Sequence, residues 1–149
     1  QISAMVLGSH GDLMVPLPDF TTVAGVSVKE LVNSERLEQI IERTRKGGAE
    51  IVSLLKTGSA YYAPAASATR MVKAILNDEK ALLPCAVYTN GEYGISGTFV
   101  GLPCILGAHG VEKIVELPIS EKERSELLRS VKEVKQGVQS LKELGFAIS

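Results

Sequence analysis

The sequence predicts a single α+β domain in which short, mostly antiparallel strands pack against three main helices. Three stretches, residues 34–56, 64–77 and 121–144, carry apolar side chains at helical spacing. The stretch 82–116 is instead β-prone and is interrupted by glycines. A chain of 149 residues is long enough for one domain with a core of its own.

The N-terminal quarter predicts strands and turns. Residues 1–7 are a candidate strand, and the glycine-flanked segment 8–12 is a candidate turn. Residues 15–18 are expected to be extended, because each proline disfavours the α conformation in the residue before it. Two β-prone runs, 20–24 and 26–28, are separated by one glycine and predict a hairpin or a bent strand.

The first long helix is predicted from Ser34, a candidate N-cap, to the region before Gly58. Two consecutive glycines, Gly47 and Gly48, keep the apolar stripe in phase, so we expect one continuous helix with a closely packed neighbour there. The second helix is expected to begin near Pro64, a residue that suits a first turn. The stripe of the first helix comprises Leu37, Ile40, Ile41, Thr44, Gly48, Ile51, Val52 and Leu55.

The C-terminal half predicts a small sheet followed by a helix. The expected strands are residues 82–89, 94–100, 103–106 and 113–117, with a turn at Asn90 and Gly91. The last helix opens with the capping-box sequence of residues 120–123 and ends at Gly145. Its inward stripe comprises Leu127, Val131, Val134, Val138 and Leu141.

Composition excludes several classes of function. Sixteen basic and seventeen acidic residues leave a net charge of -1, which argues against a broad nucleic-acid surface. The longest nearly apolar run, residues 99–108, is shorter than the roughly 20 residues of a membrane span. Cys85 and Cys104 are interpreted as small buried hydrophobes, and no metal site is predicted. The first residues lack the pattern of a signal peptide, so we expect a cytoplasmic protein.

His10 is the strongest candidate for chemistry. It follows a predicted strand and lies between Gly8 and Gly11, which permit a sharp turn and close approach of a ligand. Histidine titrates near neutral pH and therefore serves as a proton acceptor or donor. Asp12 either orients the imidazole or, as we favour, supports the turn through local backbone bonds. His109, in a predicted turn between strands, is the weaker candidate.

The connection 58–64 between the first two helices is rich in small residues. Such a segment ahead of a helix can admit a small anionic ligand near the exposed amides, but from spacing alone we favour plain close packing as the explanation. The chain has no glycine fingerprint of a dinucleotide site, no P-loop and no serine hydrolase elbow. From these patterns alone, a lone histidine does not specify a reaction.

Several segments, in order, resemble the lactate/malate dehydrogenase superfamily. Residues 6–12, with 14–17 after them, resemble its active-site segment, and residues 45–52 and 58–65 resemble the lactate-dehydrogenase-like branch of bacterial malate dehydrogenases. Two further segments, 101–103 and 110–114, match later strands of that family. The resemblance covers essentially the whole chain.

The resemblance implies the C-terminal catalytic domain of an NAD-dependent enzyme of the tricarboxylic acid cycle, spanning residues 1–149. The N-terminal Rossmann domain that holds NAD would be absent from the chain, which opens within a strand. His10 would accept a proton when malate is oxidised and donate one when oxaloacetate is reduced, while the hydride moves to or from the nicotinamide. Ser59 and Ala60 would lie beside substrate and cofactor, and Pro64 near the nicotinamide.

Several features of the family's active site are missing from this sequence. The aspartate that orients the histidine, the arginine that grips the substrate carboxylate and the mobile specificity loop have no counterpart here. The isolated chain is therefore predicted to be inactive. Residues 14–16 and 61–64 favour malate and oxaloacetate as substrates. An L-lactate dehydrogenase half-domain is the alternative within the family, whose members assemble as dimers or tetramers.

Two hypotheses from other classes stay open. The chain could be a non-catalytic oligomerisation or interaction module whose interface is formed by the amphipathic helices 34–56 and 121–144. A free-standing acid–base enzyme using His10 with Asp12 is the third hypothesis, and it requires a pocket closed by this chain alone.

Overall fold

The structure is a computed structural model that describes residues 1–146. Its strands are β1 (Ile2–Ser3), β2 (Val6–Leu7), β3 (Val15–Pro16), β4 (Thr22–Val23), β5 (Val26–Ser27), β6 (Ala81–Asn90), β7 (Ser96–Gly107) and β8 (Gly110–Ile114). Its α-helices are α1 (Val28–Leu31), α2 (Ser34–Leu55), α3 (Tyr62–Leu76) and α4 (Glu121–Glu143), and its short 3-10 helices are η1 (Pro18–Phe20) and η2 (Glu92–Gly94).

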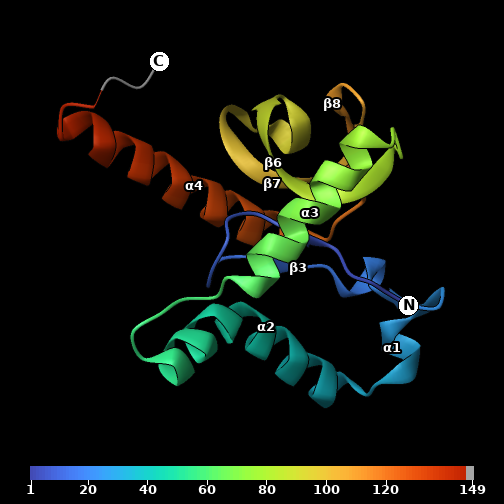
Figure 1. Cartoon of the computed structure of the whole chain (residues 1–149). Helices are drawn as coiled ribbons and strands as arrows, with labels where there is room; N and C mark the ends of the chain where they lie inside the picture. The colour runs from blue at the N-terminus through green and yellow to red at the C-terminus, as the bar shows by residue number, and fades with distance from the viewer. Residues whose placement is uncertain (147–149) are drawn as a thin grey trace.

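The strands form three small sheets, ordered β1-β4-β5, β2-β3 and β6-β7-β8. Every strand pair within residues 1–146 is antiparallel. Figure 1 shows α3 and α4 close to the β6-β7-β8 sheet, with α2 at the opposite end of the molecule. The predicted α+β class, with antiparallel strands and three main helices, is confirmed.

The core lies between β6 and β7, the β2-β3 pair and the first half of α4. Side chains of β6 alternate with period two: Cys85 and Val87 are buried, and the residues between and beside them are exposed. Across the hairpin, Leu102 and Cys104 are completely buried, and Leu127 of α4 joins them. Both cysteines are thus buried small side chains, as expected.

Three strand boundaries differ from the prediction. Residues 1–7 form two strands in different sheets, because β1 pairs with β4 and β2 pairs with β3. The runs 94–100 and 103–106 are joined in the single strand β7. Pro103 is tolerated there because it lies opposite Pro84, so the two missing N–H donors fall at one position of the ladder. The last strand, β8, begins at Gly110, before the predicted residue 113.

The helix termini follow local capping chemistry. The side chain of Asn33 caps α2, accepting from the amide three residues on at 2.8 Å, so Ser34 is the first helical residue and not the cap. Helix α3 begins at Tyr62, which places Pro64 in its first turn as predicted. The capping box that opens α4 is present, with both reciprocal hydrogen bonds between Ser120 and the glutamate three residues on.

Helix α2 is amphipathic but has no buried residue. Its apolar Leu54 is 74% exposed, and a Cβ added at Gly48 would meet no atom within 4 Å. The close neighbour expected at the glycine pair is therefore not among residues 1–146. Helix α3 is similarly open, with Ala74 as its one buried residue. Across this described part of the chain, no helix combines the length and hydropathy needed to cross a membrane.

Candidate functional site

The turn after β2 is tied directly to the central strand β7. Gly8 donates its N–H to the carbonyl of Gly101 at 2.9 Å and accepts from the Gly101 N–H at 3.0 Å. Gly8 adopts a φ of +89°, a conformation that other residues rarely take. A Cβ on Gly101 would lie only 2.5 Å from the Gly8 carbonyl oxygen. Two glycines thus allow the two backbones to approach closely enough for both hydrogen bonds.

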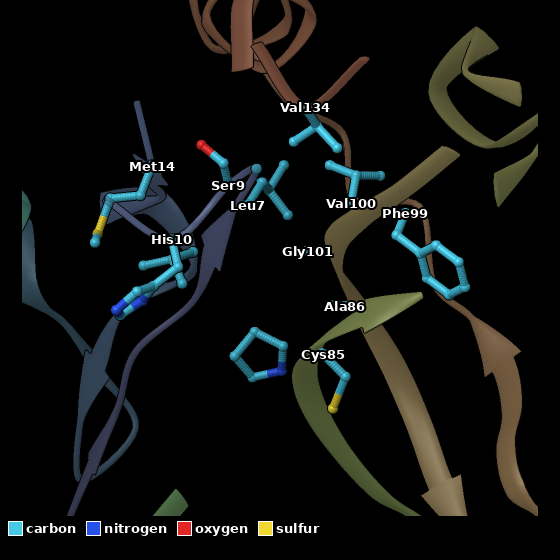
Figure 2. Close-up of a pocket in the computed structure, with 13 residues that line it drawn as sticks. Leu7, Ser9, His10, Met14, Cys85, Ala86, Phe99, Val100, Gly101 and Val134 are labelled. Carbon is cyan, nitrogen blue, oxygen red and sulfur yellow. The ribbon is translucent and has the colours of Figure 1, made fainter. Parts of the chain in front are cut away.

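A cavity of about 350 Å³, open to solvent, lies beside this turn. Figure 2 shows His10 and Met14 on one side of it, with Cys85 of β6 and Phe99 of β7 on the opposite side. Val134 of α4 lines the cavity at the top of this view. The cavity therefore joins the turn, the sheet and α4, which lie far apart in the sequence.

His10 is exposed at the edge of this cavity. Within residues 1–146, no side chain or backbone group is hydrogen-bonded to its imidazole. The ring is therefore open to exchange a proton with a ligand, and its location is set by the backbone of the turn. His109 is also exposed, in the turn between β7 and β8, and does not line the cavity.

The turn itself closes through the main chain, with the N–H of Met14 donating to the carbonyl of Gly11 at 3.0 Å. In the described part of the chain, the Asp12 carboxylate makes no hydrogen bond to His10. Asp12 instead borders a small cavity of about 70 Å³ together with Arg45 of α2 and residues of α4. The arrangement shows no His10–Asp12 dyad, which disfavours the free-standing acid–base enzyme.

The connection between α2 and α3 lies apart from the His10 cavity. Ser59 is exposed, Ala60 is half-buried and Pro64 is exposed, and within residues 1–146 none of them lines that cavity. The two neighbouring aromatic rings, Tyr61 and Tyr62, are stacked at a tilt with centroids 4.8 Å apart, and both face solvent. The roles predicted for this segment therefore stay predictions.

Cys104 does not supply a nucleophile. Burial, together with the smaller effect of the neighbouring Cys85 thiol, raises the pKa of the Cys104 thiol to about 12. The thiol of Cys104 therefore stays protonated near neutral pH. Cys85 contributes an apolar surface to the wall of the cavity.

The model of the lactate/malate dehydrogenase alpha/beta C-terminal domain matches residues 1–144. The chain belongs to the lactate/malate dehydrogenase family. The match extends over every helix and strand that the structure describes. This family assignment confirms the resemblance that the segments around His10 and Gly58 indicated.

Relatives in this family are named malate dehydrogenases. That of Roseiflexus castenholzii is 54% identical over 143 residues, covering 96% of this chain and 46% of the relative. That of Pelagibacter ubique is 55% identical over 140 residues, covering 91% and 44%. The chain therefore spans somewhat less than half the length of these curated relatives.

Solved structures of the family superpose closely on this domain. The malate dehydrogenase of Salinibacter ruber matches with a TM-score of 0.92 at 46% identity, over 96% of this chain and 47% of that one. The lactate dehydrogenase of Eimeria maxima, solved with NADH and oxamate, matches with a TM-score of 0.91 at 38% identity, over 97% and 46%. Fold similarity alone thus does not separate malate from lactate dehydrogenases.

Sequence reasoning missed three residues that hold the turn of this dehydrogenase domain. Gly101 and Ser130 contact the turn at residues 8 and 9. The guanidinium of Arg45 donates to the Met14 carbonyl at 3.1 Å and to Glu126 of α4 at 2.9 Å. Two signals were available: a glycine within a strand often marks close backbone approach, and a serine on an apolar helix stripe calls for a buried partner.

Proposed function

We propose that this chain is the catalytic half of an NAD-dependent malate dehydrogenase, in which His10 exchanges the proton. The observation that carries the proposal is the exposed imidazole on a backbone turn fixed to β7, at the edge of a solvent-open cavity. The malate dehydrogenases among its relatives and the resemblance around His10 support the same reaction.

The chemistry assigned to this chain is proton transfer. Oxidation of malate to oxaloacetate removes one hydride and one proton from the carbon and oxygen of the alcohol. NAD, when bound, would accept the hydride, and neutral His10 would accept the proton. In the reverse direction, a protonated imidazole within hydrogen-bond reach stabilises the negative charge that develops on the carbonyl oxygen and then neutralises it.

The described residues do not form a dinucleotide site by themselves. Such a site is built on parallel strands joined through helices, whereas every strand pair within residues 1–146 is antiparallel. We therefore assign NAD to a preceding Rossmann domain in the complete polypeptide. Ser59, Ala60 and Pro64 are the residues of this chain that we assign to the vicinity of substrate and nicotinamide.

The substrate is tested by comparing kcat/KM for oxaloacetate and for pyruvate on the complete polypeptide. We expect oxaloacetate to be reduced far more efficiently, as the malate dehydrogenases among the relatives indicate. Reversal of this preference would assign the chain to an L-lactate dehydrogenase. Failure with both substrates would contradict the proposed activity altogether.

The isolated chain of residues 1–149 is expected to show no malate-dependent formation of NADH. The reason is that hydride transfer needs a positioned cofactor as well as the proton-exchanging His10, and we assign the NAD site to the preceding Rossmann domain. The measurement is NADH absorbance with malate and NAD in excess. The control is the complete polypeptide at the same molar concentration, and turnover by the isolated chain at a comparable rate would contradict the prediction.

The second candidate function, an assembly interface, is favoured by the exposed apolar faces of α2 and α3. Leu54, Tyr62 and Leu76 are 74%, 81% and 79% exposed. A surface that exposes several large apolar side chains often marks a protein–protein interface. A homodimer or homotetramer would cover part of it, and sedimentation of the complete polypeptide would measure the assembly. This function is compatible with catalysis and does not replace it.

Substitution of Gly48 by alanine tests whether α2 is covered. Within residues 1–146 the added methyl group meets nothing within 4 Å, and alanine favours the helix. The isolated chain should therefore gain about 0.5–1 kcal/mol of unfolding free energy, as measured by urea denaturation. A partner that packs against Gly48 in the complete protein would be displaced by the methyl group. Weaker assembly of the Gly48→Ala protein would then locate the interface, and unchanged assembly would exclude Gly48 from it.

A further inference from the structure

We propose that Ser130 of α4 is a positioning residue for His10 and acts through the backbone of Ser9. The inference rests on the proposed function, because it assumes that His10 exchanges the proton. It adds a residue from the far end of the chain to the reaction, although that residue has no access to the substrate.

Ser130 is completely buried, and its hydroxyl makes two hydrogen bonds to the same residue, Ser9. Its Oγ accepts from the N–H of Ser9 at 2.6 Å and donates to the Oγ of Ser9 at 2.9 Å. Ser9 immediately precedes His10 in the turn. The hydroxyl therefore fixes the Gly8–Ser9 peptide group and the Ser9 side chain, one residue before the one that carries the imidazole.

The packing around Ser130 matches this role. A Cβ added at Gly8 would lie 2.7 Å from the Ser130 Oγ and 3.1 Å from its Cβ, so the serine occupies the space that a side chain on the turn would need. In α4 the buried residues are Leu127, Ser130 and Val131, which places one hydroxyl within an otherwise apolar face. A buried hydroxyl is costly unless it is hydrogen-bonded, and here Ser9 supplies both bonds.

The imidazole has no other anchor in the described residues. It is exposed, and within residues 1–146 it makes no hydrogen bond, so its location depends on the backbone of the turn, which Gly101 and Ser130 bind at residues 8 and 9. Proton transfer is sensitive to such placement: a displacement of about 1 Å can reduce the rate about a hundredfold. Loss of the Ser130 hydroxyl should therefore affect the chemical step and leave substrate binding nearly intact.

The test uses the complete enzyme with the variants Ser130→Ala and Ser130→Cys. For Ser130→Ala we expect kcat to fall about tenfold to a hundredfold, with a much smaller change in KM. We also expect the solvent deuterium isotope effect on kcat to rise, because a misplaced imidazole makes proton transfer slower than the other steps. Ser130→Cys keeps a side chain at this position but replaces the hydroxyl by a larger and more weakly hydrogen-bonding thiol, so it should also lose part of kcat.

Two matched variants of the same helix separate positioning from stability. Val131→Ala leaves a cavity at a buried position beside Ser130, and the valine side chain makes no hydrogen bond to the turn. Ser125→Ala removes an exposed hydroxyl. Both should keep kcat and the isotope effect of the parent enzyme, even where Val131→Ala lowers the melting temperature more than Ser130→Ala does. A loss of kcat that follows melting temperature across all variants would overturn the proposal, as would an unchanged kcat in both Ser130 variants.

His10→Asn distinguishes failure of this inference from failure of the proposed function. If His10→Asn abolishes turnover and the Ser130 variants do not alter it, the positioning role alone is wrong. If His10→Asn retains turnover, the proposed proton transfer is wrong, and the positioning role is overturned with it.

Discussion

Replacing His10 by asparagine in the complete enzyme is expected to reduce malate oxidation by about a hundredfold to ten-thousandfold. Asparagine is similar in size and can form hydrogen bonds, but it does not take up or release a proton at neutral pH. The side chain is exposed and makes no hydrogen bond within residues 1–146, so its replacement should leave the unfolding free energy within about 0.5 kcal/mol of the parent. Steady-state kinetics in both directions and urea denaturation measure the two effects.

The matched control for this variant is His109→Asn. His109 is the other histidine of the chain, is also exposed, and lies in the turn between β7 and β8, outside the His10 cavity. It should keep full activity. Light scattering should show the same assembly for both variants and the parent. Substantial turnover by the His10→Asn enzyme would show that this histidine is structural.

Replacing Gly101 by alanine is expected to have the largest effect on stability. The new Cβ would lie 2.5 Å from the carbonyl oxygen of Gly8, a backbone atom that moves only if the whole turn moves. Overpacking and the loss of two backbone hydrogen bonds together should cost about 2–4 kcal/mol of unfolding free energy. Because the turn carries His10, activity should fall as well, and both are measured on the complete enzyme.

The control for this second substitution is Gly137→Ala in α4. A Cβ there meets no atom within 4 Å in the described residues, so alanine should be neutral or stabilise the helix by about 0.5–1 kcal/mol. Activity should stay at the parent level. Equal stability of the Gly101→Ala and parent proteins would mean that the contact between Gly8 and Gly101 does not hold the turn.

The features that sequence reasoning located correctly are those encoded by neighbouring residues. Helix α4 was defined by its capping box and by a stripe of apolar residues at spacings of three and four. The glycines around His10 indicated a turn after a strand, which the structure has. One of the errors is also local: Asn33 and Ser34 are both good N-caps, and only the hydrogen bond to the helix amide distinguishes them.

By itself, the amino-acid sequence determined the α+β class, the three main helices and the candidate histidine, because propensity, periodicity and turn chemistry act over a few residues. Tertiary structure alone decided what holds that histidine, since Gly101 and Ser130 reach the turn from distant parts of the chain. It also decided that α2 has no buried residue within this domain. Contacts between distant segments depend on how whole elements pack, and no local pattern specifies their partners.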